Sequence, residues 1–141
     1  MNKFDSIQDQ LIYHEGERLK PYKCEAGKLT IGIGHNLENG ISKAASRFIF
    51  NEDLKESSDW LVGFFGPHTW ECFSDGRKRA LIDLRFNLGS DRFMGFKRMI
   101  TAIRQGKWDM AAYELLDSLW WRQVQEDRRQ LLYHQLKTGE C

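Results

Sequence analysis

One short stretch of this sequence carries nearly all of its β-forming signals, and this restricts the folds that the chain can adopt. Between residues 19 and 37, β-branched and aromatic residues are interspersed with Pro21 and three glycines. Lys20–Cys24 and Lys28–Gly32 flank the turn-forming Glu25-Ala26-Gly27, a pattern that predicts a β-hairpin. Elsewhere the apolar residues recur at helical spacing. We therefore expect an α+β fold that is mainly helical.

Helices are expected on both sides of the hairpin. Gly16 is a natural stop for the first, and Ser42 can cap a long second one. The predicted helices span residues 4–14, 42 to about 61, 75–88, 92–104, 108–119 and 125–138. This pattern predicts a single domain, 1–141, with a small N-terminal lobe, a long connecting helix and a helical C-terminal lobe. The lobes would cover about 1–60 and 61–141 and border a cleft, a common place for a ligand.

Charge and cysteine usage limit the classes of partner and site. The net charge is +1, but residues 1–76 hold 8 basic and 12 acidic side chains, whereas residues 77–141 hold 13 basic and 8 acidic. A basic second half, including Arg122 and Arg128, would suit nucleic acid or a carboxylate-rich cell wall, although chance explains such asymmetry equally well. The three cysteines lack close spacing, so we expect free thiols and no zinc site.

The ends and the hydropathy of the chain indicate where it is made. No apolar run approaches the roughly 20 residues that span a bilayer, and no apolar segment follows the first residues as in a signal peptide. We expect a protein that folds in a cytoplasm and is released by another factor if it acts outside.

Glu15 is the most promising acid. It follows the first predicted helix, where the negative end of the helix dipole disfavours an ionised carboxylate. A protonated glutamic acid is what glycoside cleavage requires, because it donates a proton to the leaving oxygen. On position alone, an ordinary exposed glutamate is the simpler interpretation.

The segment from His14 to His35, HEGERLKPYKCEAGKLTIGIGH, resembles the active-site region of the phage-type lysozymes. That family has Glu, eight residues, Asp or Cys, five residues and Thr, which here are Glu15, Cys24 and Thr30. The resemblance continues through Phe-Asn-Glu-Asp, Phe-Asn-Leu-Gly and Lys-Trp-Asp-x-Ala-Ala, so it covers nearly the whole chain. It implies a lysozyme-like fold in which the Glu-Asp/Cys-Thr triad carries Cys at its second position.

The resemblance also implies roles for these residues. Glu15 would be the general acid, and Thr30 would position the attacking water, since a hydroxyl both donates and accepts hydrogen bonds. Cys24 would orient water, act as a base once ionised, or serve as a covalent nucleophile. These alternatives stay open, as does a purely structural thiol.

Further residues are candidates for binding the substrate. His35 matches a family histidine that forms an ion pair with an aspartate, here Asp53. Phe86 and Asn87 would contact the sugar from the C-terminal lobe, because an aromatic face and an amide suit its ring and hydroxyls. Gly-Ile-Gly-His lacks a third glycine, which excludes a dinucleotide site. We expect neither metal nor cofactor.

The resemblance therefore predicts a muramidase that hydrolyses the β-1,4 bond between N-acetylmuramic acid and N-acetylglucosamine. The context would be a phage endolysin: a monomer without nucleic-acid or membrane partners, held in the host bacterial cytoplasm until a holin gives access to the periplasmic wall. A lytic transglycosylase is the first alternative, although it needs no water-placing threonine. A non-catalytic glycan-binding homologue is the second, and Cys24 is its only support.

Overall fold

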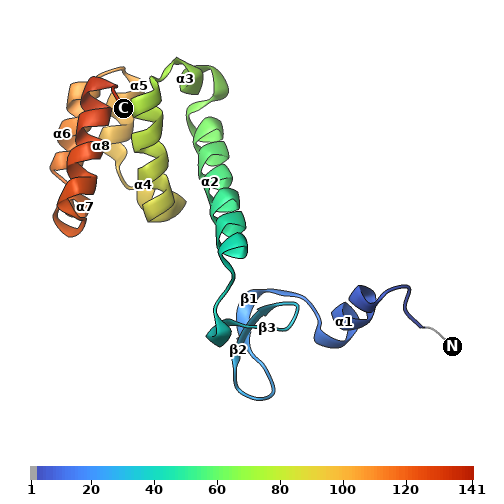
Figure 1. The fold of residues 1–141 in the computed structure, drawn as a ribbon. Helices are drawn as coiled ribbons and strands as arrows, with labels where there is room; N and C mark the ends of the chain where they lie inside the picture. The colour runs from blue at the N-terminus through green and yellow to red at the C-terminus, as the bar shows by residue number, and fades with distance from the viewer. Residues whose placement is uncertain (1–2) are drawn as a thin grey trace. The chain divides into compact units, whose positions relative to one another are not determined.

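The computed structural model describes residues 3–141, which form two units, one extending to Phe48 and the other comprising Ile49–Cys141 (Figure 1). The elements of the first unit are α1 (Ile7–Glu15), β1 (Arg18–Lys23), β2 (Leu29–Gly32), β3 (His35–Asn36) and a short 3-10 helix, η1 (Leu37–Asn39). The strands form an antiparallel sheet in the order β1-β2-β3. Thr30 pairs with Tyr22 on one side and Asn36 on the other, so β2 is the central strand.

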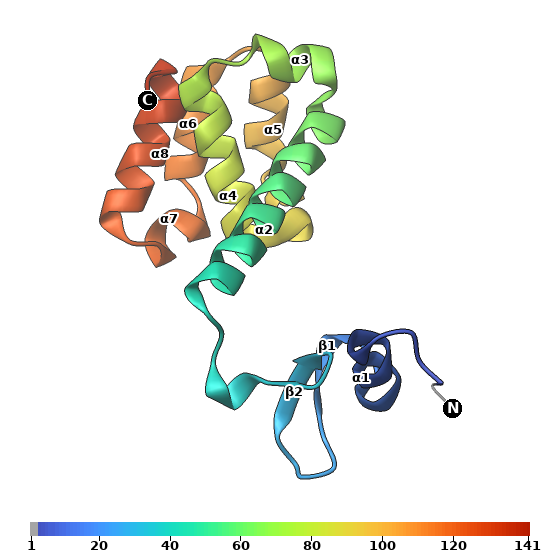
Figure 2. The same cartoon turned by 45° about the vertical axis from the view of Figure 1, so that its right-hand side comes forward.

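The long helix α2 (Lys43–Phe65) begins in the first unit and continues into the second. Ser42 caps it, since its hydroxyl accepts a hydrogen bond from the Ala45 backbone N–H at 3.1 Å. The helices that follow are α3 (Pro67–Cys72), α4 (Asp75–Met94), α5 (Lys97–Arg104), α6 (Trp108–Leu116), α7 (Leu119–Gln123) and α8 (Glu126–Thr138). Both ribbon views show α8 lying beside α4 and α6 (Figure 2).

The hydrophobic core lies in the second unit. Its largest fully buried side chains come from α2, α4, α5, α6 and α8: Leu61, Leu81, Leu84, Phe93, Met99, Ile103, Leu115, Leu132 and Leu136. One buried cation, Arg85, is paired with Glu56 at 2.6 Å and lies over the Trp60 ring. Burial of this apolar surface is the main stabilising term for such a bundle, and it accounts for the helical spacing of apolar residues in the sequence.

The predicted α+β, mainly helical class is confirmed, while several boundaries differ. The two-residue strand β3 and the short helices α3 and α7 were not predicted. Pro67 begins α3 rather than only ending α2, because proline is favoured at the first position of a helix. The helix expected to end at Gly89 is interrupted there, at φ +79°, but its last turn runs on to Met94.

The single domain with lobes at about 1–60 and 61–141 stays a prediction. The contacts assign α2 from Ile49 onward to the second unit, since Ser57, Leu61 and Phe65 are buried with the later helices. None of the helices within residues 3–141 combines the length and the apolar character that crossing a bilayer requires.

Candidate active site

Glu15 is the last residue of α1, one residue beyond the helix end expected from the sequence. The Ser6 hydroxyl accepts from the Asp9 N–H at the start of this helix. At its end Gly16 adopts φ +71°, and its N–H donates to the Ile12 carbonyl at 2.8 Å. Because glycine tolerates this conformation better than other residues, the helix stops directly after Glu15. The acid is thus presented at a helix C-terminus and is exposed.

The carboxyl group of Glu15 lies against the turn between β2 and β3. A methyl group added at Gly34 would lie 2.6 Å from Glu15 Oε2 and 2.9 Å from its Cδ. The end of α1 and the glycine-rich exit from β2 therefore meet at the side chain of the candidate acid. In the sequence Gly34 belongs to the Gly-Ile-Gly-His segment, and no spacing rule would have revealed its contact with Glu15.

Cys24 and Thr30 lie together at the other end of β2. The Cys24 N–H donates to the Lys28 carbonyl at 2.9 Å and closes the predicted hairpin turn. Backbone hydrogen bonds to the sulfur, chiefly from Lys28 and then from Ala26, lower the pKa of the Cys24 thiol, and burial opposes them. The thiolate, the chemically active form of cysteine, therefore forms at a lower pH here than in an unperturbed cysteine.

Thr30 is almost fully buried, with 4% of its surface exposed. Its hydroxyl donates to the Lys28 carbonyl at 2.8 Å. A hydroxyl that donates in one direction still has lone pairs to accept in another. Thr30 can therefore receive a hydrogen bond from a water molecule next to Cys24, in keeping with the role that we predict for it.

Replacing Thr30 with valine should slow turnover more than it weakens substrate binding. Valine keeps the β-branched shape but removes the hydroxyl, so we expect kcat to fall about 100-fold, the usual loss for a positioned donor or acceptor, with KM changed far less. Thr30→Ser retains the hydroxyl and is the matched control. Steady-state kinetics on soluble peptidoglycan would measure both variants, and an unchanged kcat in Thr30→Val would remove Thr30 from the mechanism.

His35 lies next to Gly34 in the first unit, and its Nε2 is 2.7 Å from the Gly40 carbonyl oxygen. This bond ties the start of β3 to the residue that follows η1. Asp53 belongs to α2 in the second unit. The ion pair between His35 and Asp53 and the contact of His35 with substrate stay predictions.

Phe86 and Asn87 are both exposed on α4. The Phe86 ring meets the Phe50 ring edge to face at 5.9 Å. The Asn87 Oδ1 accepts from the indole Nε1 of Trp120 at 2.9 Å, which orients the amide and leaves its NH₂ group free to donate. This bond was not predicted from the sequence, since its partners are 33 residues apart.

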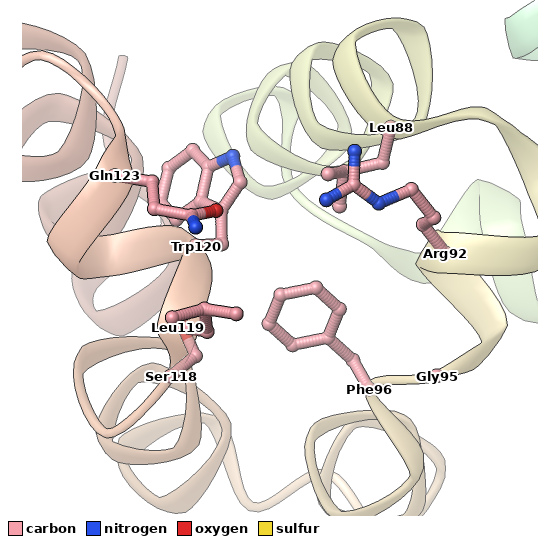
Figure 3. A pocket seen from close by; sticks show the side chains of 8 residues that line it. All are labelled: Leu88, Arg92, Gly95, Phe96, Ser118, Leu119, Trp120 and Gln123. Carbon is pink, nitrogen blue, oxygen red and sulfur yellow. The ribbon is translucent and has the colours of Figure 1, made fainter.

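Trp120 also lines a cavity of about 350 Å³ in the second unit. In Figure 3 the Phe96 ring points into this cavity toward Leu119, and the Arg92 side chain extends in from α4. Arg128 is paired with Asp83 at 2.5 Å, and its contact with carboxylates of the wall stays a prediction. No group of three or more potential metal-binding side chains occurs within residues 3–141.

Comparison with known proteins gives a consistent set of relatives. A family model described as phage lysozyme matches residues 13–135. Two probable T4-type lysozymes of Dictyostelium discoideum are similar: one is 29% identical, covering 82% of this chain and 84% of that protein, and the other is 28% identical, covering 95% of each. The endolysin of Salmonella phage P22 is 34% identical over 61% of this chain and 62% of its own length.

Proposed function

Because the chain belongs to the phage lysozyme family, it is a peptidoglycan hydrolase of the lysozyme type, and we propose that it cleaves the β-1,4 bond between N-acetylmuramic acid and N-acetylglucosamine. One observation carries the proposal. The Glu15 carboxyl lies against the turn that follows β2, and the same strand holds Thr30 beside the Cys24 thiol. An acid at the end of α1 and a water-activating pair at β2 thus belong to the first unit, and together they are the set of groups that glycoside hydrolysis requires.

The proposed reaction assigns one task to each side chain. Glu15 gives its proton to the bridging oxygen as the bond from that oxygen to the anomeric carbon breaks. A water molecule held by the Thr30 hydroxyl attacks the anomeric carbon, and its proton passes to the Cys24 sulfur. We favour this role as base over covalent attack, because the Thr30 hydroxyl lies at the sulfur and provides a place for the water. No cofactor enters these steps.

The biological setting of this proposal is bacterial lysis by an endolysin. In it the protein is a monomer that accumulates in the cytoplasm of the host and reaches the periplasmic wall through a holin. The endolysin relative from Salmonella phage P22 supports this context. Phe86, Asn87 and His35 are the proposed contacts with the glycan.

The chemistry of the products tests the proposal directly. Purified peptidoglycan digested with the protein should release fragments that end in reducing N-acetylmuramic acid, identified by mass spectrometry before and after borohydride reduction. Fragments with 1,6-anhydro ends would assign the protein to the lytic transglycosylases instead. Binding to the wall without fragment release, and without clearing of permeabilised bacteria, would identify a non-catalytic glycan-binding protein.

A further inference from the structure

We propose that Gly34 is a positioning residue that sets where the Glu15 carboxyl lies by carrying no side chain. This inference rests on the proposed function, in which Glu15 is the acid. It adds a residue outside the Glu-Cys-Thr set and assigns it a purely steric task. The observation that carries it is the close packing of the Glu15 side chain on the backbone of Gly34.

The Glu15 side chain has little else to fix it. It is exposed, it stands at the end of α1, and within residues 3–141 it takes part in no ion pair or side-chain hydrogen bond. A glutamate in that position would sample several rotamers. Packing of its Cγ, Cδ and Oε2 atoms over Gly34 is therefore the contact that selects one of them.

A side chain at residue 34 would displace the acid. A Cβ at that position would lie 2.6, 2.9 and 3.2 Å from Oε2, Cδ and Cγ of Glu15, respectively, inside the distance of about 3.5 Å at which non-bonded atoms pack best. The atoms in the way form the free end of a flexible side chain, so rotation of Glu15 relieves the overlap. Such a movement is costly for catalysis, because a misplacement of about 1 Å lowers rates roughly 100-fold.

Gly32 provides a matched control two residues earlier. Both glycines have φ +66°, a conformation that other residues adopt only with strain. A Cβ added at Gly32 would have no heavy atom within 4 Å, whereas one added at Gly34 would collide with Glu15. Alanine therefore causes the same kind of backbone strain at both positions but meets the acid only at residue 34.

The experiment compares Gly34→Ala with Gly32→Ala in the full chain. We expect kcat on soluble peptidoglycan to fall about 100-fold in Gly34→Ala and by less than about threefold in Gly32→Ala, with KM little changed and with similar shifts in melting temperature. Equal losses of kcat in the two variants would overturn the inference, since backbone strain alone would then explain the effect.

A measurement by nuclear magnetic resonance tests the contact between Glu15 and Gly34 without relying on enzymatic activity. In protein labelled with carbon-13, nuclear Overhauser effects should connect the Glu15 γ-protons to the Gly34 α-protons, and the Glu15 carboxyl signal should move in Gly34→Ala but not in Gly32→Ala. The wild-type measurement remains decisive even if Gly34→Ala fails to fold. Absence of the Overhauser effects overturns the inference.

Failure of the proposed function and failure of the role of Gly34 give different results. If the wild-type protein releases no reducing ends, the proposed function is wrong, and the Overhauser effects still decide whether Gly34 positions Glu15. If the wild-type protein is active and Gly34→Ala keeps its full kcat, only the role of Gly34 is wrong.

Discussion

Glu15→Gln should lower the hydrolysis of peptidoglycan by about 10²- to 10⁴-fold, the range typical of a lost general acid, and should stop the lysis of permeabilised bacteria. Glutamine has almost the same size and shape as glutamic acid, but it has no acidic proton for the leaving oxygen. Without that proton the sugar must depart as an alkoxide. The release of reducing ends from purified peptidoglycan measures the loss.

Glu17→Gln is the matched control for this prediction. Glu17 is also exposed, and it lies two residues further along, between α1 and β1. The control therefore removes one negative charge from the same region and leaves the proposed acid intact. Both variants should melt at the same temperature as the wild-type protein, because neither side chain belongs to the core. Normal turnover in Glu15→Gln would refute its assignment as the acid.

Local sequence signals predicted the ends of those elements that a glycine or a short turn terminates. Gly16 ends α1 and the turn at Glu25-Ala26-Gly27 closes the hairpin, so both features were predictable, whereas the helix begins at Ile7 and not at residue 4 as expected. The strand β3 is only two residues long and has no periodicity to detect. Pro67 starts the short helix α3, which was not predicted, because a proline was not expected to begin a helix there.

Some features of the candidate site were predictable from the spacing of residues in the sequence, and others depend on packing in three dimensions. Glu15, Cys24 and Thr30 were identifiable because their separation in sequence matches a family pattern. The packing of Glu15 against Gly34 and the hydrogen bond from Trp120 to Asn87 depend on where side chains lie after folding. No periodicity or motif encodes such contacts, so they required the structure.

The second large effect is expected at Cys24, where alanine and aspartate should behave in opposite ways. Cys24→Ala removes the proposed base, and turnover should fall about 100-fold or more. Cys24→Asp should keep turnover within about tenfold of the wild-type protein, because a carboxylate can accept the same Lys28 and Ala26 backbone hydrogen bonds and can also take a proton from water. Loss of activity in both variants would argue against the base.

Alkylation tests the state of the same sulfur. In a Cys72→Ser/Cys141→Ser background Cys24 is the only thiol, so iodoacetamide should inactivate the protein in proportion to the label bound. The lowered pKa of Cys24 means that the thiolate forms at a lower pH than in a free cysteine, whose pKa is about 8.5. The alkylation rate should therefore rise and level off at lower pH in the folded protein than in the same chain unfolded in urea. Full lytic activity after complete labelling would mean that the thiol takes no part in the reaction and that its hydrogen bonds serve only the turn.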